Sequence, residues 1–217
     1  YAGVALYASR SRDGGQHFDP EYKVADHSCE CCRTTLERTP QGEVASLFRS
    51  VYGDNIRDHS YAVLPRVDGA VVPQRATFSQ WQVAACPDQG PGLAIGRDGV
   101  RHAVWYEASH GPAIWYGQLN PGHQPKHKLK IGGAGASHAD VAAQGKTVWV
   151  VWNQVSAKGY TLMLRTSNDH GDSFASPRAL ATSSVAAYSP QLLVHNGRAY
   201  VAWNTLDGFR LMAVTVK

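Results

Sequence analysis

The sequence predicts an all-β chain built from repeated four-stranded antiparallel units. No segment of ten or more residues shows the apolar period of a helix, whereas short apolar runs recur between glycine-rich turns. Four of these runs end in an aromatic residue, six or seven positions after a glycine, and the aromatic residues recur about every 50 residues. That interval suits one blade of a β-propeller and is too long for most helical repeats.

The same order of strands is expected in every unit. The first strands are predicted over residues 34–37, 92–95, 139–143 and 191–194, and the second strands, which carry the aromatic anchors, over 42–48, 99–105, 145–152 and 197–203. Third strands are predicted over 4–7, 60–64, 113–117, 160–165 and 209–216, and a more polar fourth strand closes each unit. Labelled a to d from the centre outward, the chain reads c-d, a-b-c-d three times, then a-b-c, which gives 17 strands in one domain over residues 1–217.

Two octets with the spacing Ser-x-Asp-x-Gly-x-x-Phe occupy the turns between third and fourth strands. Their Ser and Asp side chains can accept hydrogen bonds from backbone N–H groups of a tight turn, and Gly takes a dihedral that other residues resist. We expect both phenylalanines to be buried. The octet residues are Ser11, Asp13, Gly15 and Phe18 in one copy and Ser167, Asp169, Gly171 and Phe174 in the other, with degenerate versions at 67–69 and 119–122.

These octets resemble the Asp-box (BNR) repeat of sialidase-like β-propellers. The resemblance implies a fold of antiparallel blades, usually six of them. This chain accounts for about four, so we expect it to be part of a six-bladed propeller whose N-terminal blades precede Tyr1. The cysteine pattern resembles that of bacterial BNR-repeat proteins that carry a Cys-x-Cys-Cys segment and a later Cys-Pro-x-x-Gly-Pro.

Composition, charge and the lengths of apolar runs exclude some classes of function. Charged residues make up 18% and hydrophobic residues 43% of the chain, which describes a folded protein. The net charge is +4, but the basic residues cluster only at Lys126–Lys130, where a solvated turn explains them better than a nucleic-acid patch. No apolar run approaches the roughly 20 residues of a membrane helix. We therefore expect neither a nucleic-acid partner nor a membrane span.

Strand direction alternates along a blade, so the loops fall on two opposite faces. The a–b turns and the octets share one face, and the d–a and b–c loops share the other, which we call the rim face. The rim face carries the longer loops and the unusual residues, and function tends to concentrate in such loops. These residues are Cys29, Cys31, Cys32, Cys86, His138 and Tyr188 in d–a loops, and Asp54, Arg57, Asp58, His59, Glu107 and His110 in b–c loops.

The four cysteines allow three interpretations: a disulfide, a metal site, or buried structural cysteines with no special role. A bond between the adjacent Cys31 and Cys32 would be strained, so a cross-blade bridge from Cys86 to Cys29 or Cys31 is the favoured disulfide. Alternatively, thiolates could bind a soft ion, Cu or Zn, with Cys31, Cys32, His27 and His138 as the candidate ligands.

The resemblance also implies an enzymatic alternative, the hydrolysis of glycosides. Sialidases use arginines for the substrate carboxylate and a tyrosine nucleophile paired with a glutamate. The candidates here are Tyr188, Glu107, Arg33 and Arg57. The match is incomplete, because no Phe/Tyr-Arg-Ile-Pro segment is present and no third arginine falls on the rim face of the later blades.

The favoured interpretation is therefore a secreted or periplasmic bacterial propeller without glycosidase activity, which acts as a binding or scaffold module. We expect its partner to be another protein or protein complex, with carbohydrate as the alternative ligand. An exo-α-sialidase is the alternative function.

Overall fold

The computed structural model describes residues 2–65 and 69–214, and its regular structure is almost entirely antiparallel β-sheet. A single turn of 3-10 helix, η1 (Gly53–Asn55), lies between β4 and β5 in this part of the chain. The strands are β1 (Val4–Ala8), β2 (Tyr22–Ser28), β3 (Thr35–Arg38), β4 (Val44–Arg49), β5 (His59–Leu64), β6 (Gln74–Arg75), β7 (Gly92–Ile95), β8 (Arg101–Glu107), β9 (Ala113–Asn120), β10 (His123–Gly132), β11 (Ala136–Gln144), β12 (Thr147–Ser156), β13 (Gly159–Ser167), β14 (Arg178–Ser183), β15 (Gln191–His195), β16 (Arg198–Thr205) and β17 (Gly208–Ala213).

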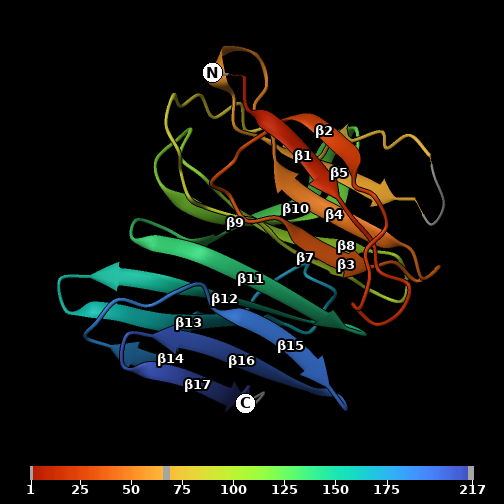
Figure 1. Cartoon of the computed structure of the whole chain (residues 1–217). Helices are drawn as coiled ribbons and strands as arrows, with labels where there is room; N and C mark the ends of the chain where they lie inside the picture. Colours follow the sequence, from red (N-terminus) through yellow and green to blue (C-terminus); the bar gives the residue numbers. More distant parts are fainter. Residues whose placement is uncertain (1, 66–68, 215–217) are drawn as a thin grey trace.

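The strands form sheets in the predicted order. A two-stranded sheet, β1–β2, is followed by the four-stranded sheets β3–β6, β7–β10 and β11–β14 and by the three-stranded sheet β15–β17. Figure 1 shows the sheets following one another from β1 to β17, with the two termini at opposite ends of the series. The first strands β3, β7, β11 and β15 contact one another in turn, which places them at the inner side of a propeller arrangement. The predicted fold class is confirmed.

The apolar core lies in the layers between successive sheets. One cluster joins β3–β6 to β7–β10 through Leu47 and Leu93, and another joins β11–β14 to β15–β17 through Val151 and Val201. The second strands β4, β8 and β12 are covered on both faces, so their sequences are nearly continuous apolar runs, whereas the buried residues of β16 alternate with more exposed ones. This double burial explains why the second strands were the clearest signal in the sequence.

The aromatic anchors occupy equivalent places. Trp105, Trp152 and Trp203 lie on β8, β12 and β16, and each is at most 2% exposed. Two of the indoles find acceptors: Trp105 Nε1 donates to Glu107 Oε2 at 2.9 Å, and Trp203 Nε1 donates to Asn153 Oδ1 at 2.9 Å. The predicted equivalence of the three tryptophans is confirmed.

The two octets form the turns β1–β2 and β13–β14 with the expected local hydrogen bonds. Asp13 Oδ1 accepts from the backbone N–H groups of Gln16 and His17, at 3.1 and 2.9 Å. Asp169 Oδ1 accepts from the Ser173 N–H at 3.0 Å. The predicted bonding of both aspartates inside their own turns is confirmed.

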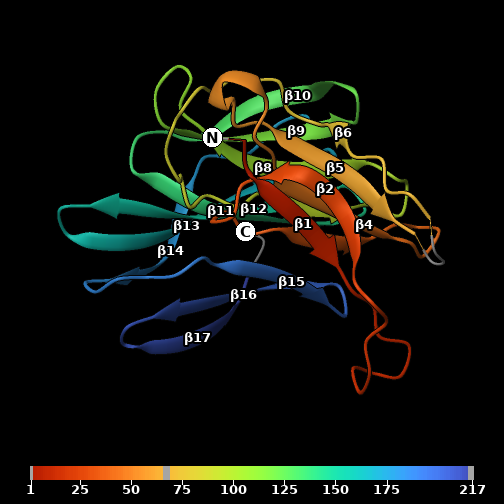
Figure 2. The ribbon, with the colours of Figure 1, turned by 45° about the horizontal axis from the view of Figure 1, so that its top comes forward.

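The predicted burial of Phe18 is wrong, and Phe174 is only half-buried. Phe18 is 64% exposed, and in Figure 2 the red loop between β1 and β2 projects away from the sheets. The ring that packs on Phe174 belongs to Tyr116, at 4.8 Å between centroids, and it comes from the preceding sheet. The β1–β2 sheet is the first of this chain, so the described residues supply no corresponding ring for Phe18.

The basic cluster Lys126–Lys130 is not a turn but part of the long outer strand β10. Lys128 turns back toward the sheet: its Nζ lies 4.4 Å from the ring centre of Trp115 and 3.0 Å from Glu107 Oε1. The charges therefore follow one edge of a blade. The degenerate octet predicted at 67–69 and the end of the strand predicted at 209–216 fall largely or partly outside the described residues.

In the described residues, no helix has the length and apolar character needed to cross a membrane.

Candidate functional site

The cysteine rim, which we define as Cys29, Cys31, Cys32 and Cys86, is formed by the β2–β3 and β6–β7 loops. As β2 ends, the Cys29 N–H donates to the Arg49 carbonyl at 2.9 Å, which aligns the loop with the end of β4. The Cys32 N–H then donates to the Cys29 carbonyl at 3.4 Å and closes a tight turn. This turn, which directly follows β2, brings the sulfur atoms of Cys29, Cys31 and Cys32 together.

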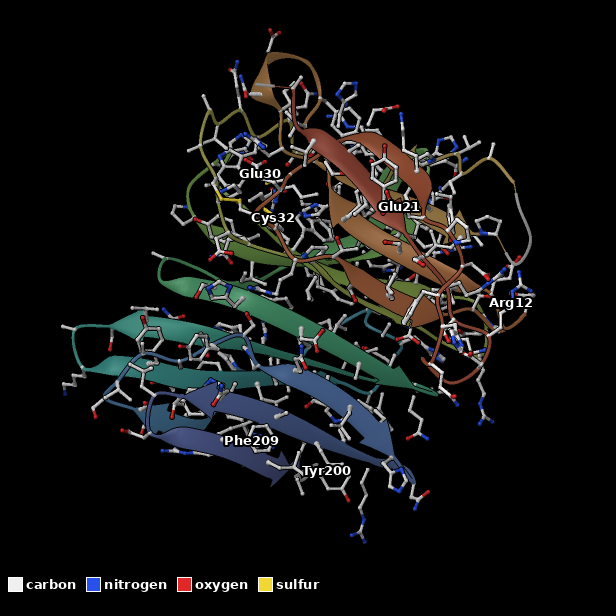
Figure 3. All side chains as sticks on the ribbon, viewed as in Figure 1. Arg12, Glu21, Glu30, Cys32, Tyr200 and Phe209 are labelled. Atoms are coloured by element: carbon white, nitrogen blue, oxygen red, sulfur yellow. A yellow bond between two sulfur atoms is a disulfide. The ribbon has the colours of Figure 1, made fainter. Side chains whose placement is uncertain are left out.

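A disulfide joins the two loops. Cys31 is bonded to Cys86, 55 residues further along the chain, with 6.2 Å between their Cα atoms. Figure 3 shows this bond in yellow beside the labelled Cys32. The predicted cross-blade disulfide is therefore present. Of the two cysteines predicted to pair with Cys86, Cys29 and Cys31, it is Cys31 that forms the bond.

Cys29 and Cys32, which the sequence also offers as disulfide candidates, are free thiols. They are 5% and 8% exposed, and their Sγ atoms lie 3.1 Å apart. Cys29 Sγ also lies 3.5 Å from Cys31 Sγ. A buried dithiol therefore lies in contact with one end of a disulfide.

A buried cation lies beside this dithiol. Arg49 is 1% exposed, and its guanidinium donates to the carbonyls of Arg57, Gln89 and Tyr106, at 2.8 to 3.3 Å. All three acceptors are uncharged, so the positive charge of Arg49 is not neutralised by them. Sequence reasoning missed Arg49; its only signal was a charged residue at the end of the apolar run Leu47–Phe48.

The environment makes the two thiols unequal. The hydrogen bond from the Cys32 thiol lowers the pKa of Cys29 well below its ordinary value, and the charges of Arg57 and Arg49 lower it further against the opposing effect of burial. The same hydrogen bond and burial raise the pKa of Cys32. Cys29 is thus the more acidic thiol of the pair.

A third blade reaches the rim face through His138, which the sequence placed in a d–a loop but which lies at an irregularity near the start of β11. The Arg33 guanidinium lies 2.9 Å from His138 Nδ1, and the His138 N–H donates to Gln89 Oε1 at 2.9 Å. Burial and the nearby Arg33 charge lower the pKa of His138. The β2–β3 and β6–β7 loops are therefore joined by the disulfide, and both contact the start of β11 through His138.

The predicted metal ligands do not form one set. Cys31 is part of the disulfide, His138 contacts Arg33, and His27 Nδ1 lies 2.8 Å from the Ala2 carbonyl. The atoms that do come together are the sulfurs of Cys29, Cys31 and Cys32, all within 4.8 Å of one another. With the disulfide closed, two thiols remain to hold a soft ion.

The candidate glycosidase residues differ in their burial and in the groups that they contact. Glu107 is 3% exposed and accepts from Trp105 and Lys128, whereas the Tyr188 side chain is 55% exposed. Arg57 is 2% exposed and donates to the Val83 carbonyl at 3.1 Å.

Two further b–c loop residues point into their blade. Asp58 is fully buried and pairs with Arg75, and it also accepts from the Ser79 hydroxyl at 2.7 Å. His59 Nδ1 lies 3.1 Å from the Thr77 hydroxyl, and burial lowers the pKa of His59 well below its ordinary value. Both residues therefore tie the β5–β6 hairpin to the blade and do not contribute to the rim surface.

Asp140 is a carboxyl group that sequence reasoning did not select. It lies on β11, lines a cavity of about 180 Å³ together with Arg33 and Ser189, and accepts from the Leu192 N–H at 2.7 Å. Burial raises its pKa to about 6. The available signal was an acidic residue in an otherwise apolar inner strand.

The sequence matches no protein-family model and no curated protein, but its structure is similar to several solved structures. The Hadza microbial sialidase Hz136 aligns at TM-score 0.56 and 13% identity over 83% of this chain and 43% of its own. An α-L-arabinofuranosidase (CtGH43) from Clostridium thermocellum ATCC 27405 aligns at TM-score 0.51 and 10% identity over 99% of this chain and 89% of its own. A subtype N11 neuraminidase-like protein of A/flat-faced bat/Peru/033/2010 (H18N11) aligns at 0.50 and 12%, over 94% and 53%.

At these identities the likeness concerns the fold. The chain spans less than half the length of the sialidase that it matches. It shares its antiparallel-blade propeller with sialidase, neuraminidase-like and GH43 proteins.

Proposed function

We propose that this chain is part of a sialidase-like BNR propeller that acts as a non-catalytic binding module, with the rim face as its binding surface. The observation that carries the proposal is the connection of two d–a loops by the Cys31–Cys86 disulfide, and of both loops to the start of β11 by the contacts of His138 with Arg33 and Gln89. A surface fixed in this way loses little conformational entropy when a partner binds. The Asp-box assignment is supported by the spacing of both octets and by their backbone hydrogen bonds.

The proposed compartment is the periplasm or the exterior of a bacterial cell. Disulfides persist in oxidising compartments and are rare in the cytosol, so the Cys31–Cys86 bond supports this placement. The proposed partner is another protein, because the rim is assembled from loops of several blades and offers a broad surface. A carbohydrate is the alternative ligand.

Site-specific photo-cross-linking tests the binding role. A photoreactive residue at the exposed rim position Ala85 is expected to give a discrete cross-linked product in the intact producing cell, identified by mass spectrometry. The matched control places the same residue at Lys146, in an a–b turn on the opposite face. Equal products from the two positions, or none from Ala85, would contradict a binding surface on the rim face.

A glycosidase is the second candidate, because a carboxyl group with a raised pKa at a cavity is typical of a general acid and Asp140 is such a group. For the binding module we expect no hydrolysis of fluorogenic sialosides or arabinofuranosides above the buffer rate. Turnover that disappears in the Tyr188→Phe or Asp140→Asn variant would establish the glycosidase and overturn the non-catalytic assignment.

A further inference from the structure

The free thiols of the rim have the spacing of a redox pair. Cys29 and Cys32 are separated by Glu30 and Cys31, and the turn between them places their Sγ atoms 3.1 Å apart. Two thiols held in a Cys-x-x-Cys turn can form a disulfide with little backbone movement. Here the second residue inside the turn is itself a cysteine that is already bonded.

That bonded cysteine is within reach of the pair. Cys29 Sγ lies 3.5 Å from Cys31 Sγ, close enough for a sulfur nucleophile to attack after a small displacement. The other end of the disulfide, Cys86, is exposed to solvent. A cavity of about 170 Å³ is lined by Cys29, Arg57 and Cys86, so the thiol and the far end of the disulfide face the same space.

We propose that the four cysteines form a thiol–disulfide exchange site, in which the buried Cys29/Cys32 dithiol reduces an outside protein or peptide disulfide through the Cys31–Cys86 bond. The exchange does not depend on which ligand the rim face binds. Its substrate class is a disulfide, and its chemistry needs no metal or cofactor step.

The first two steps move the disulfide inward. The Cys29 thiolate attacks Cys31 Sγ, so that a Cys29–Cys31 bond forms, the Cys31–Cys86 bond breaks, and Cys86 leaves as a thiolate that takes a proton from solvent. Cys32 then loses its proton and attacks Cys29 Sγ. A Cys29–Cys32 bond forms, and Cys31 leaves with the proton. No electrons leave the protein in this isomerisation.

The last two steps transfer an electron pair to the substrate. The exposed Cys86 thiol returns its proton to solvent, attacks the outside disulfide as the thiolate, forms a mixed disulfide and releases one substrate thiolate. Cys31 attacks Cys86 Sγ, restores the Cys31–Cys86 bond and releases the second thiolate. In sum, the Cys29 and Cys32 thiols are oxidised to a disulfide, and the substrate disulfide is reduced to two thiols. An outside dithiol resets the site by the reverse route.

The surroundings assign the roles within the pair. The buried Arg49 and Arg57 favour the thiolate form of Cys29, and only the thiolate is a sulfur nucleophile. Cys32 is the resolving thiol, because it is the free thiol whose Sγ lies 3.1 Å from Cys29 Sγ. Cys86 is the end that meets the substrate, because Cys29 and Cys32 are nearly inaccessible.

Alkylation without any reductant tests the internal exchange. The native protein is treated with N-ethylmaleimide at pH 7, quenched with acid, and mapped by peptide mass spectrometry. The expected product carries the label on Cys86, a residue that starts in a disulfide, and contains a new Cys29–Cys32 bond. An intact Cys31–Cys86 bond with label confined to Cys29 and Cys32, or with no label at all, would overturn the proposal.

Serine variants separate the two internal steps. Cys32→Ser is expected to stop after the first step, with labelled Cys86 and a Cys29–Cys31 disulfide. Cys29→Ser removes the nucleophile and is expected to slow Cys86 labelling by about tenfold or more. Unchanged Cys86 labelling in Cys29→Ser would contradict the assigned nucleophile, and the circular dichroism of each variant checks that it folds.

Oxidised glutathione serves as the probe for the outside step. Wild-type protein is expected to release about two equivalents of reduced glutathione as the Cys29–Cys32 bond forms and the Cys31–Cys86 bond is restored. The double variant Cys31→Ser/Cys86→Ser retains the dithiol, lacks the accessible end and leaves no third thiol, so its glutathione release is expected to be at least about tenfold slower. Equal rates in the two proteins would show that the dithiol reacts directly and would overturn the relay.

Discussion

Arg49 illustrates what a single residue contributes to the rim. Its guanidinium is buried against three backbone carbonyls and keeps its charge next to two thiols. The sequence could place Arg49 at the end of a strand, but not beneath the cysteines, because its acceptors Gln89 and Tyr106 lie about 40 to 57 residues away along the chain. The cysteines themselves were predictable, since loop order alone brings their ends to one face.

Asp140 is the residue that should couple stability to pH. Its folded-state pKa of about 6 lies above the ordinary value of 3.8, so the folded state disfavours its charged form. The penalty is absent below about pH 4, develops as the pH rises, and is complete above about pH 6. The Asp140→Asn variant is therefore expected to gain stability relative to wild type between pH 4.5 and 7.5, by about 1–3 kcal/mol.

Urea unfolding of wild type and of the Asp140→Asn variant, at about pH 4.5 and about pH 7.5, measures this difference in unfolding free energy. Burial also lowers the pKa of His59 and of His102, to about 4 for His102, so both proteins lose stability toward acid and that loss cancels in the comparison. The control is Asp26→Asn: Lys23 lowers the pKa of that carboxyl from its ordinary value of 3.8, so Asp26 is charged at both pH values and its difference from wild type should not change between them. A difference between Asp140→Asn and wild type that does not change with pH would refute the assignment.

Strands and turns differed in how well the sequence predicted them. The second strands β4, β8 and β12 and the inner strand β7 were placed closely, because burial on two faces gives them continuous apolar runs. The strand β10 was mistaken in part for a turn, because an outer strand faces solvent and its lysines carry no apolar pattern. The octets were predicted as turns because their hydrogen bonds are local. Burial of their phenylalanines depends on the neighbouring sheet, which the motif does not encode.

The two octets therefore provide a matched pair of mutations. Phe174→Ala removes a ring that packs on Tyr116 and is expected to cost about 1–3 kcal/mol of unfolding free energy. Phe18→Ala removes a ring that is 64% exposed and is expected to change stability by less than about 0.5 kcal/mol. Denaturant unfolding measures both, and equal losses would contradict the different packing of the two turns.

At the scale of the whole molecule, the fold follows from repetition. The c-d, a-b-c-d and a-b-c order was readable because each blade repeats one pattern of glycine turn and aromatic anchor, and the sheets form in that order. The chemistry was less readable. Which cysteine pairs with Cys86 depends on a contact between blades, and the bonds of Glu107 to Trp105 and Lys128 depend on contacts inside one blade; no local pattern specifies either.

The arrangement of the four sulfurs is the central claim, and disulfide mapping tests it most directly. The protein is denatured without reductant at acid pH, its free thiols are alkylated and counted, and its peptides are mapped by mass spectrometry. We predict two free thiols, at Cys29 and Cys32, and one disulfide that links the peptides of Cys31 and Cys86. Four free thiols, or a bond between Cys86 and Cys29 in place of Cys31, would contradict this account of the rim.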